Sequence, residues 1–222
     1  DSDISVINAI ADMAGPSEAH VFAEDWDLRE GVSDTQLDFS SDHVHSLLDS
    51  EELSGLYAAA LRMTRGWTGQ ILEVGCGVGR LSREMALRHE TDLVVLDNNL
   101  KALLYCTGAV PQVTACIGDA CALPFQNATF EHVVALNVVD LLESPEDFLD
   151  EAFRVIRPGG SCLLSTPDPA LGLPDGDYER LERFALNAGF ELQSRLDDLV
   201  WTRHVSPREL QVFSTQILLL SR

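Results

Sequence analysis

The chain has 222 residues, 45% of them hydrophobic, so it can bury one sizeable core, and no apolar run approaches the roughly 20 residues of a membrane span. Its formal net charge is −21, and Lys101 is the only lysine among 15 basic residues. This balance disfavours DNA and RNA as partners, because nucleic-acid affinity depends on neutralising phosphates with Lys and Arg.

The first 66 residues carry no strong strand signal, and we predict them to form an N-terminal helical lid in front of a domain spanning residues 67–222. An apolar stripe at helical spacing from Leu53 to Leu61 predicts a helix that packs beside a sheet. The acidic stretch before it contains a lone tryptophan, Trp26. Three histidines of this region are candidates for reaching a pocket: His20, His43 and His45.

The most informative stretch is Ile-Leu-Glu-Val-Gly-Cys-Gly-Val-Gly-Arg at residues 71–80. A buried strand is predicted first, then glycines at 75, 77 and 79, and then the first turn of a helix. Glycine lets the backbone approach a ligand closely, and a helix start offers unpaired N–H groups, so this corner is predicted to bind a ligand. Arg80 departs from the dinucleotide fingerprint G-x-G-x-x-G, which has glycine or another small residue at its end.

A second apolar strand ends in a carboxylate at Asp97, roughly 20 residues beyond Gly75. An acidic side chain at the end of the neighbouring parallel strand can accept hydrogen bonds from both ribose hydroxyls of a nucleotide. At this point of the chain, NAD and S-adenosylmethionine are both compatible ligands.

Strands and helices then alternate regularly up to the C-terminus. Ser144-Pro145-Glu146-Asp147 has the composition of a helix start, and Pro158-Gly159-Gly160 that of its end. The last strand is expected to lie antiparallel between the fifth and sixth. The remaining predicted elements are strands at 113–117, 130–137, 162–166, 190–196 and 210–220, a helix at 178–189, and a hairpin loop at 201–207.

Four features in family order resemble the class I S-adenosylmethionine-dependent methyltransferases, and the type 11 group among them. They are the corner at 71–80 with its Glu73, the Gly-Asp-Ala-Cys-Ala-Leu-Pro-Phe segment at 118–125, the strand that follows it at 130–137, and Arg-Pro-Gly-Gly at 157–160. The resemblance implies an α/β Rossmann-like fold with a seven-stranded, mostly parallel sheet, an antiparallel last strand and the helical lid. It further implies methyl transfer from S-adenosylmethionine to a small molecule, with S-adenosylhomocysteine as the product.

The resemblance also assigns roles to individual residues. Glu73 would orient the methionine ammonium, and the backbone of Gly75, Cys76, Gly77 and Gly79 would pass under the methionine and ribose. The other implied contacts are Asp97 with the ribose hydroxyls, Asn98 beside the adenine, Asp119 with the adenine amino group, the Ala120 N–H with the adenine ring, and the Asn137 carbonyl with the methionine end.

Two residues are candidates for the chemical step, because each follows a strand at the rim where an acceptor would enter: Asp140 and His204. Trp26 and Tyr57 are further candidates for contact with the sulfonium or an aromatic substrate, although core packing is the expected role of Tyr57. No metal site is expected. The five cysteines, with no C-x-x-C pair, indicate buried thiols in a cytoplasmic protein.

Two other functions remain open from the sequence. The chain is also compatible with a non-catalytic S-adenosylmethionine-binding module that regulates a partner, or with a protein methyltransferase. Neither the acceptor nor the oligomeric state can be predicted from these residues.

Overall fold

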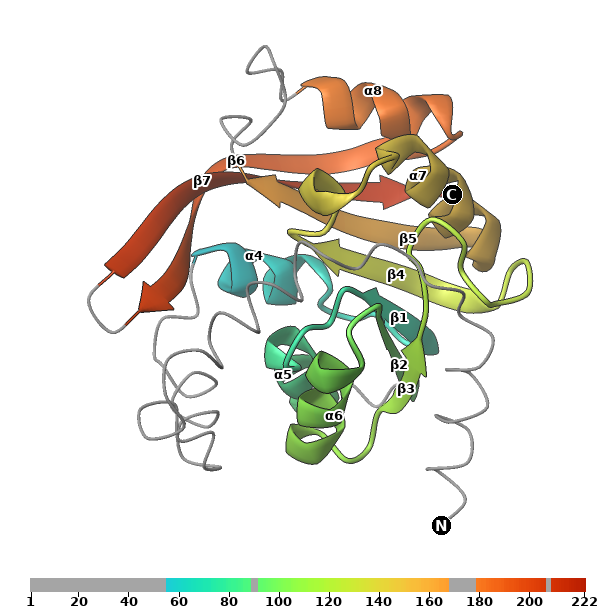
Figure 1. The fold of residues 1–222 in the computed structure, drawn as a ribbon. Helices are drawn as coiled ribbons and strands as arrows, with labels where there is room; N and C mark the ends of the chain where they lie inside the picture. The colour runs from blue at the N-terminus through green and yellow to red at the C-terminus, as the bar shows by residue number, and fades with distance from the viewer. Residues whose placement is uncertain (1–54, 89–91, 168–178, 207–208) are drawn as a thin grey trace.

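The computed structural model describes residues 55–88, 92–167, 179–206 and 209–222. They form a seven-stranded sheet in the order β3-β2-β1-β4-β5-β7-β6 (Figure 1). Strand β7 pairs antiparallel with β5 and β6, and the other pairs are parallel, which confirms the predicted fold class. The strands are β1 (Gln70–Val74), β2 (Asp92–Asp97), β3 (Thr114–Ile117), β4 (Phe130–Leu136), β5 (Ile156–Pro167), β6 (Glu191–Ser206) and β7 (Glu209–Ser221).

Helices cover both faces of the sheet (Figure 1). One face carries α4 (Gly55–Met63), α5 (Arg80–Arg88) and α6 (Leu100–Ala109), and the other carries α7 (Pro145–Val155) and α8 (Glu179–Asn187). Consecutive strand residues point to opposite faces, so Leu163 packs in the first layer and Leu164 in the second. Two buried layers explain why the central strands read as continuous apolar runs rather than alternating ones.

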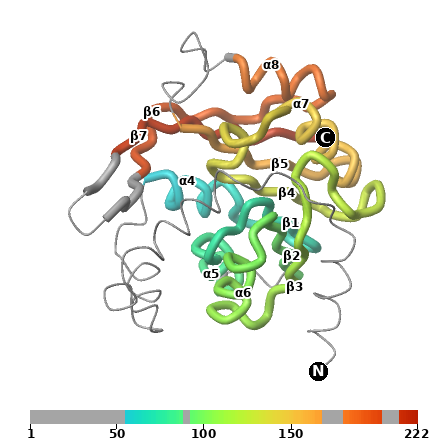
Figure 2. The backbone as a smooth tube through the Cα atoms, viewed as in Figure 1, coloured from blue at the N-terminus to red at the C-terminus, as the bar shows by residue number. Residues whose placement is uncertain are grey.

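Helix α4 belongs to the buried core of the described residues. Leu56, Ala59 and Ala60 are fully buried, and a Cβ on Gly55 would lie 3.7 Å from the Val200 nitrogen of β6. The backbone tube shows α4 beside the part of β6 and β7 that projects past the shorter strands (Figure 2). The rest of the predicted lid lies outside the described residues, so the domain boundary at residue 66 stays a prediction.

The start of α7 forms as its residues predict, but its end differs. Ser144 accepts a hydrogen bond from the Asp147 nitrogen at 3.4 Å, and Pro145 occupies the first turn. The helix ends at Val155, and Arg-Pro-Gly-Gly lies inside β5 as an irregularity in its register with β4. Gly159 has a positive φ of 82°, so the chain still turns here, and its nitrogen donates to the Arg222 oxygen at 2.9 Å, which pairs this segment with the last residue.

The prediction of a loop at 201–207 was wrong for most of its length. Strand β6 runs to Ser206, ten residues beyond the expected end, and pairs with β7 almost to the hairpin tip. The polar sequence before Pro207 favours a loop, but tertiary contacts hold it extended. Trp201 pairs with Phe213 across the strands, with their ring centroids 5.0 Å apart.

Within these residues no helix combines the length and apolar character needed to cross a membrane. All five cysteines lie in the described part of the chain, and all are free thiols, as predicted. Four of them are buried, and Cys121 is half-buried.

Candidate cofactor and active site

The glycine corner joins β1 to α5 at the carboxyl end of the sheet. Gly75, Gly77 and Gly79 all have positive φ, at 70°, 52° and 88°. The Gly75 nitrogen donates to the Leu96 oxygen at 2.7 Å, which ties the turn to β2. The chain therefore turns sharply between β1 and α5, as the sequence predicts.

One side of this corner is tightly packed and another is open. A Cβ on Gly79 would lie 2.7 Å from the Cys106 sulfur and 3.2 Å from its Cα, so a side chain there would push α6 away. At Gly77, by contrast, no described atom lies within 4 Å of the position that a Cβ would occupy. The corner thus offers room for a ligand along its backbone at Gly77.

Asp97, at the end of β2, is bonded directly to this corner. Its Oδ2 accepts from Gly77 N at 2.9 Å, and its Oδ1 accepts from Asn99 N at 2.9 Å. Burial raises the pKa of the Asp97 carboxyl, and these backbone N–H groups oppose that shift. The neighbouring Asn98 is exposed. Asn99, which the sequence analysis did not single out, caps α6 by accepting from Lys101 N at 2.9 Å.

Glu73 lies beneath the corner with 4% of its surface exposed. Its Oε2 accepts from the Ser82 hydroxyl at 2.5 Å. Burial raises the pKa of the Glu73 carboxyl to about 8, although the Ser82 hydrogen bond favours the charged form. The group is thus mostly protonated at pH 7, and a ligand ammonium beside it would favour ionisation.

Binding of S-adenosylhomocysteine is therefore expected to release a proton from Glu73. Because the free carboxyl has a pKa of about 8, affinity should rise as pH increases from 6 to 8, by at most about tenfold per unit. Calorimetry at pH 7 in two buffers of different ionisation enthalpy measures the released proton. In Glu73→Gln, binding should release no proton from this site, and equal proton release in both proteins would contradict the assignment.

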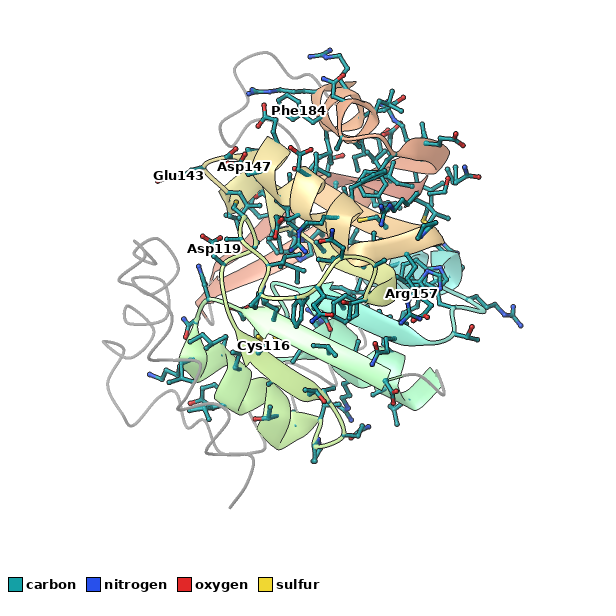
Figure 3. The ribbon with its side chains drawn as sticks, turned by 90° about the vertical axis from the view of Figure 1, so that its right-hand side faces the viewer. Cys116, Asp119, Glu143, Asp147, Arg157 and Phe184 are labelled. Atoms are coloured by element: carbon teal, nitrogen blue, oxygen red, sulfur yellow. The ribbon has the colours of Figure 1, made fainter. Side chains whose placement is uncertain are left out.

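The segment after β3 places Asp119 and Ala120 beside Asp97. Gly118 N donates to Asp97 O at 3.1 Å. Asp119 is exposed, and its Oδ1 accepts from Cys121 N at 2.8 Å, whereas Ala120 is buried. Figure 3 shows Asp119 at the same end of the sheet as Asp147, with Arg157 at the opposite end.

Asn137 follows β4 in a left-handed conformation, with φ 55°. Ser165, at the matching level of β5, holds this turn: Asn137 N donates to Ser165 Oγ at 2.9 Å, and Ser165 Oγ donates to Asn137 Oδ1 at 3.0 Å. The next residue, Val138, has a methyl group 2.2 Å from the position that a Cβ on Gly75 would take. The end of β4 and the glycine corner are therefore in direct contact.

The two candidates for the chemical step lie in different surroundings. Asp140 sits in a short 3-10 helix (Val139–Leu141), and its Oδ1 is buried with no hydrogen-bond partner among the described residues. Burial raises the pKa of the Asp140 carboxyl to about 6. His204 lies in β6 opposite Leu210 rather than in a loop, and its side chain is outside the described residues.

Most of the predicted cofactor residues thus meet at one edge of the sheet, and small polar residues that the sequence analysis did not single out hold them in place: Ser82, Asn99 and Ser165. Tyr57 of α4 also lies here, with the Arg80 guanidinium 4.9 Å from its ring centroid. His20, His43, His45 and Trp26 lie outside the described residues.

Comparison with known proteins agrees with this geometry. Residues 72–164 match the family model of a methyltransferase domain. A protein of Mycolicibacterium smegmatis named as a probable S-adenosylmethionine-dependent methyltransferase is 33% identical over 57% of this chain and 53% of its own length. A sterol 24-C-methyltransferase of Schizosaccharomyces pombe is 33% identical over 41% of this chain and 26% of its own. The chain thus spans about half the length of the first relative and about a quarter of the length of the second.

Among solved structures, a TehB-like methyltransferase of Corynebacterium glutamicum has the same fold, with a TM-score of 0.62 and 17% identity over 82% of this chain and 95% of that one. Residues 72–164 thus match a methyltransferase domain, and the described residues have the fold of the class I S-adenosylmethionine-dependent methyltransferases. Within this class, the matching family is that of the type 11 methyltransferases, as the motifs predicted. S-adenosylmethionine is the cofactor of the class.

Proposed function

We propose that this protein transfers the methyl group of S-adenosylmethionine to a small-molecule acceptor at the carboxyl edge of its sheet. The observation that carries the proposal is the contact between the glycine corner and Asp97, whose Oδ2 accepts from Gly77 N at 2.9 Å. Its carboxylate lies where ribose hydroxyls can bond to it, next to the open space at Gly77.

The surrounding residues fit this cofactor. Glu73, buried below the corner, can ionise against the methionine ammonium. Asp119 is exposed, and its second carboxylate oxygen remains for an adenine amino group while Oδ1 accepts from Cys121 N. The left-handed turn at Asn137 is fixed by Ser165, and the next residue, Val138, contacts the corner at Gly75, so the Asn137 carbonyl would be near the methionine end of the cofactor.

Bound S-adenosylmethionine supplies a sulfonium, whose methyl group is a strong electrophile and leaves a neutral thioether when transferred. The chain therefore has to hold the acceptor in line and exclude water. Orientation of this kind can lower an activation barrier by up to roughly 7–11 kcal/mol. Where the acceptor loses a proton, Asp140 would take it, since its buried Oδ1 has no partner among the described residues. The role of His204 remains a prediction.

The acceptor class rests on the relatives and on charge. One relative is named for sterol methylation, which supports a small molecule over a macromolecule. The net charge of −21 opposes binding to nucleic acid. The charge thus disfavours nucleic acid as the acceptor, and the named relative favours a small molecule over a protein.

The test is incubation with methyl-labelled S-adenosylmethionine and a cell extract, followed by separation of small molecules from protein and nucleic acid. We expect label in a small-molecule fraction, and clearly less label there with Asp97→Ala at a cofactor concentration near the wild-type KM. Label confined to protein would indicate a protein methyltransferase instead. Cofactor binding without any labelled product would favour the regulatory module.

A further inference from the structure

The loop that follows Asp119, residues 121–127, is fastened to α7 by one arginine. Arg154 Nη2 donates to the Leu123 oxygen at 3.0 Å. Its Nη1 donates to the Phe125 oxygen at 2.7 Å and to Asn127 Oδ1 at 2.9 Å. A guanidinium is planar and offers several donors in fixed directions, so a single side chain can hold three points of the loop at once.

Glu151, one helical turn earlier, completes the attachment. Its Oε2 accepts from Leu123 N at 2.7 Å, so the amide and the carbonyl of Leu123 are both bound by α7. Arg154 Nε donates to Glu151 Oε1 at 2.6 Å, and the two side chains are only 29% and 22% exposed. The hydrogen bond from Arg154 lowers the pKa of Glu151, so the pair is ionised at neutral pH. Such charge-assisted, forked contacts are geometrically specific.

The fastened loop lies directly against the residue before Asp119. A Cβ on Gly118 would lie 3.4 Å from the Pro124 ring and 3.2 Å from Leu96, so Pro124 packs against this backbone. Leu123, beside it, is 4% exposed. Asp119 itself is exposed, and within its own segment only a local turn to Cys121 orients its carboxylate.

We propose that Arg154, paired with Glu151, is a positioning residue for adenine selectivity: it holds the 121–127 loop so that Asp119 faces the adenine amino group. This inference rests on the proposed function, because it needs a bound adenine. Without Arg154, the carbonyls of Leu123 and Phe125 would lose a donor, and Pro124 could move away from Gly118. The Asp119 carboxylate would then sample several orientations, and its contribution to recognising the amino group would fall.

The test compares S-adenosylhomocysteine with S-inosylhomocysteine, in which an oxo group replaces the adenine amino group. The oxo ligand also carries a proton on ring nitrogen N1, so the ratio of their dissociation constants reports recognition of this edge of the adenine, separately from general cofactor binding. Wild type should prefer the adenine ligand, and Asp119→Ala should reduce that preference, since the Ala120 N–H can still distinguish the two ring nitrogens. Arg154→Met should reduce the ratio between about 3- and 30-fold, and Arg154→Lys should give an intermediate value. Adding Arg154→Met to Asp119→Ala should reduce the ratio no further.

Arg195→Met is the matched control. Arg195 is 28% exposed and pairs with Asp197 at 2.9 Å and Glu182 at 3.2 Å, away from the loop. In Arg195→Met, the ratio of the two dissociation constants should equal that of wild type. A folded Arg154→Met with the wild-type ratio overturns the inference; if this variant does not fold, an unchanged ratio in Arg154→Lys overturns it. Failure of wild type to bind S-adenosylhomocysteine would instead refute the proposed function.

Discussion

An Asp140→Asn variant is expected to lose about 10²- to 10⁴-fold in kcat. Asparagine matches the aspartate in size but cannot accept a proton, so the loss would measure general-base catalysis. Burial raises the pKa of Asp140 to about 6, and a base acts in its ionised form. Wild-type kcat/KM, which reports the free enzyme, should therefore rise as pH increases through about 6, and this acidic limb should be absent from the variant. The measurement is kcat and kcat/KM against pH from 5 to 9 once an acceptor is known.

Asp147→Asn provides the control, because Asp147 is an exposed carboxylate at the same end of the sheet (Figure 3). Its kcat and pH limb should match those of wild type. A raised KM in Asp140→Asn at every pH, with kcat unchanged, would mean that Asp140 positions the acceptor only. If Asp140→Asn keeps the wild-type kcat and KM, Asp140 takes no part in the reaction. Methyl transfer would then depend only on holding the acceptor close to the cofactor.

Asp97→Ala should weaken binding of S-adenosylhomocysteine by about 1–3 kcal/mol, which is roughly 5- to 150-fold. The substitution removes the carboxylate proposed to bind the ribose. It also leaves Gly77 N and Asn99 N without the acceptor that each has at 2.9 Å. Calorimetric titration of wild type and variant gives the difference.

Asp97→Asn separates these two effects, since the amide keeps one acceptor for the backbone but has no charge. We expect its affinity to lie between those of wild type and Asp97→Ala. An alanine variant that folds and binds the ligand as tightly as wild type would show that the ribose lies elsewhere.

The parts of the fold that depend on local chemistry were predictable from the sequence. The cap at Ser144, the glycine corner and the apolar strands formed where their residues indicated. The extents of β5 and β6 were not predictable, because they depend on contacts between distant residues: Arg222 with the start of β5, and Trp201 with Phe213. A local pattern contains no information about such partners.

The candidate site likewise contains residues that could be predicted from the sequence and residues that could not. Asp97 and Asp119 were identified because each carboxylate follows a strand in a recognisable motif. Ser82 and Ser165 were missed, since a serine in a helix or at a strand end has no signal until its partner, Glu73 or Asn137, is known. The attachment of the loop by Arg154 was hidden for the same reason: two of its loop partners are backbone oxygens about 30 residues earlier.

The most direct test of the central claim is a calorimetric titration of the wild-type protein with S-adenosylhomocysteine and, separately, with NAD. Both ligands carry an adenosine, and both suit a glycine corner followed by a carboxylate at a strand end. The structure and the matching family predict binding of S-adenosylhomocysteine, weakened in Asp97→Ala, and no measurable heat from NAD. Tight binding of NAD with no response to S-adenosylhomocysteine would contradict the account.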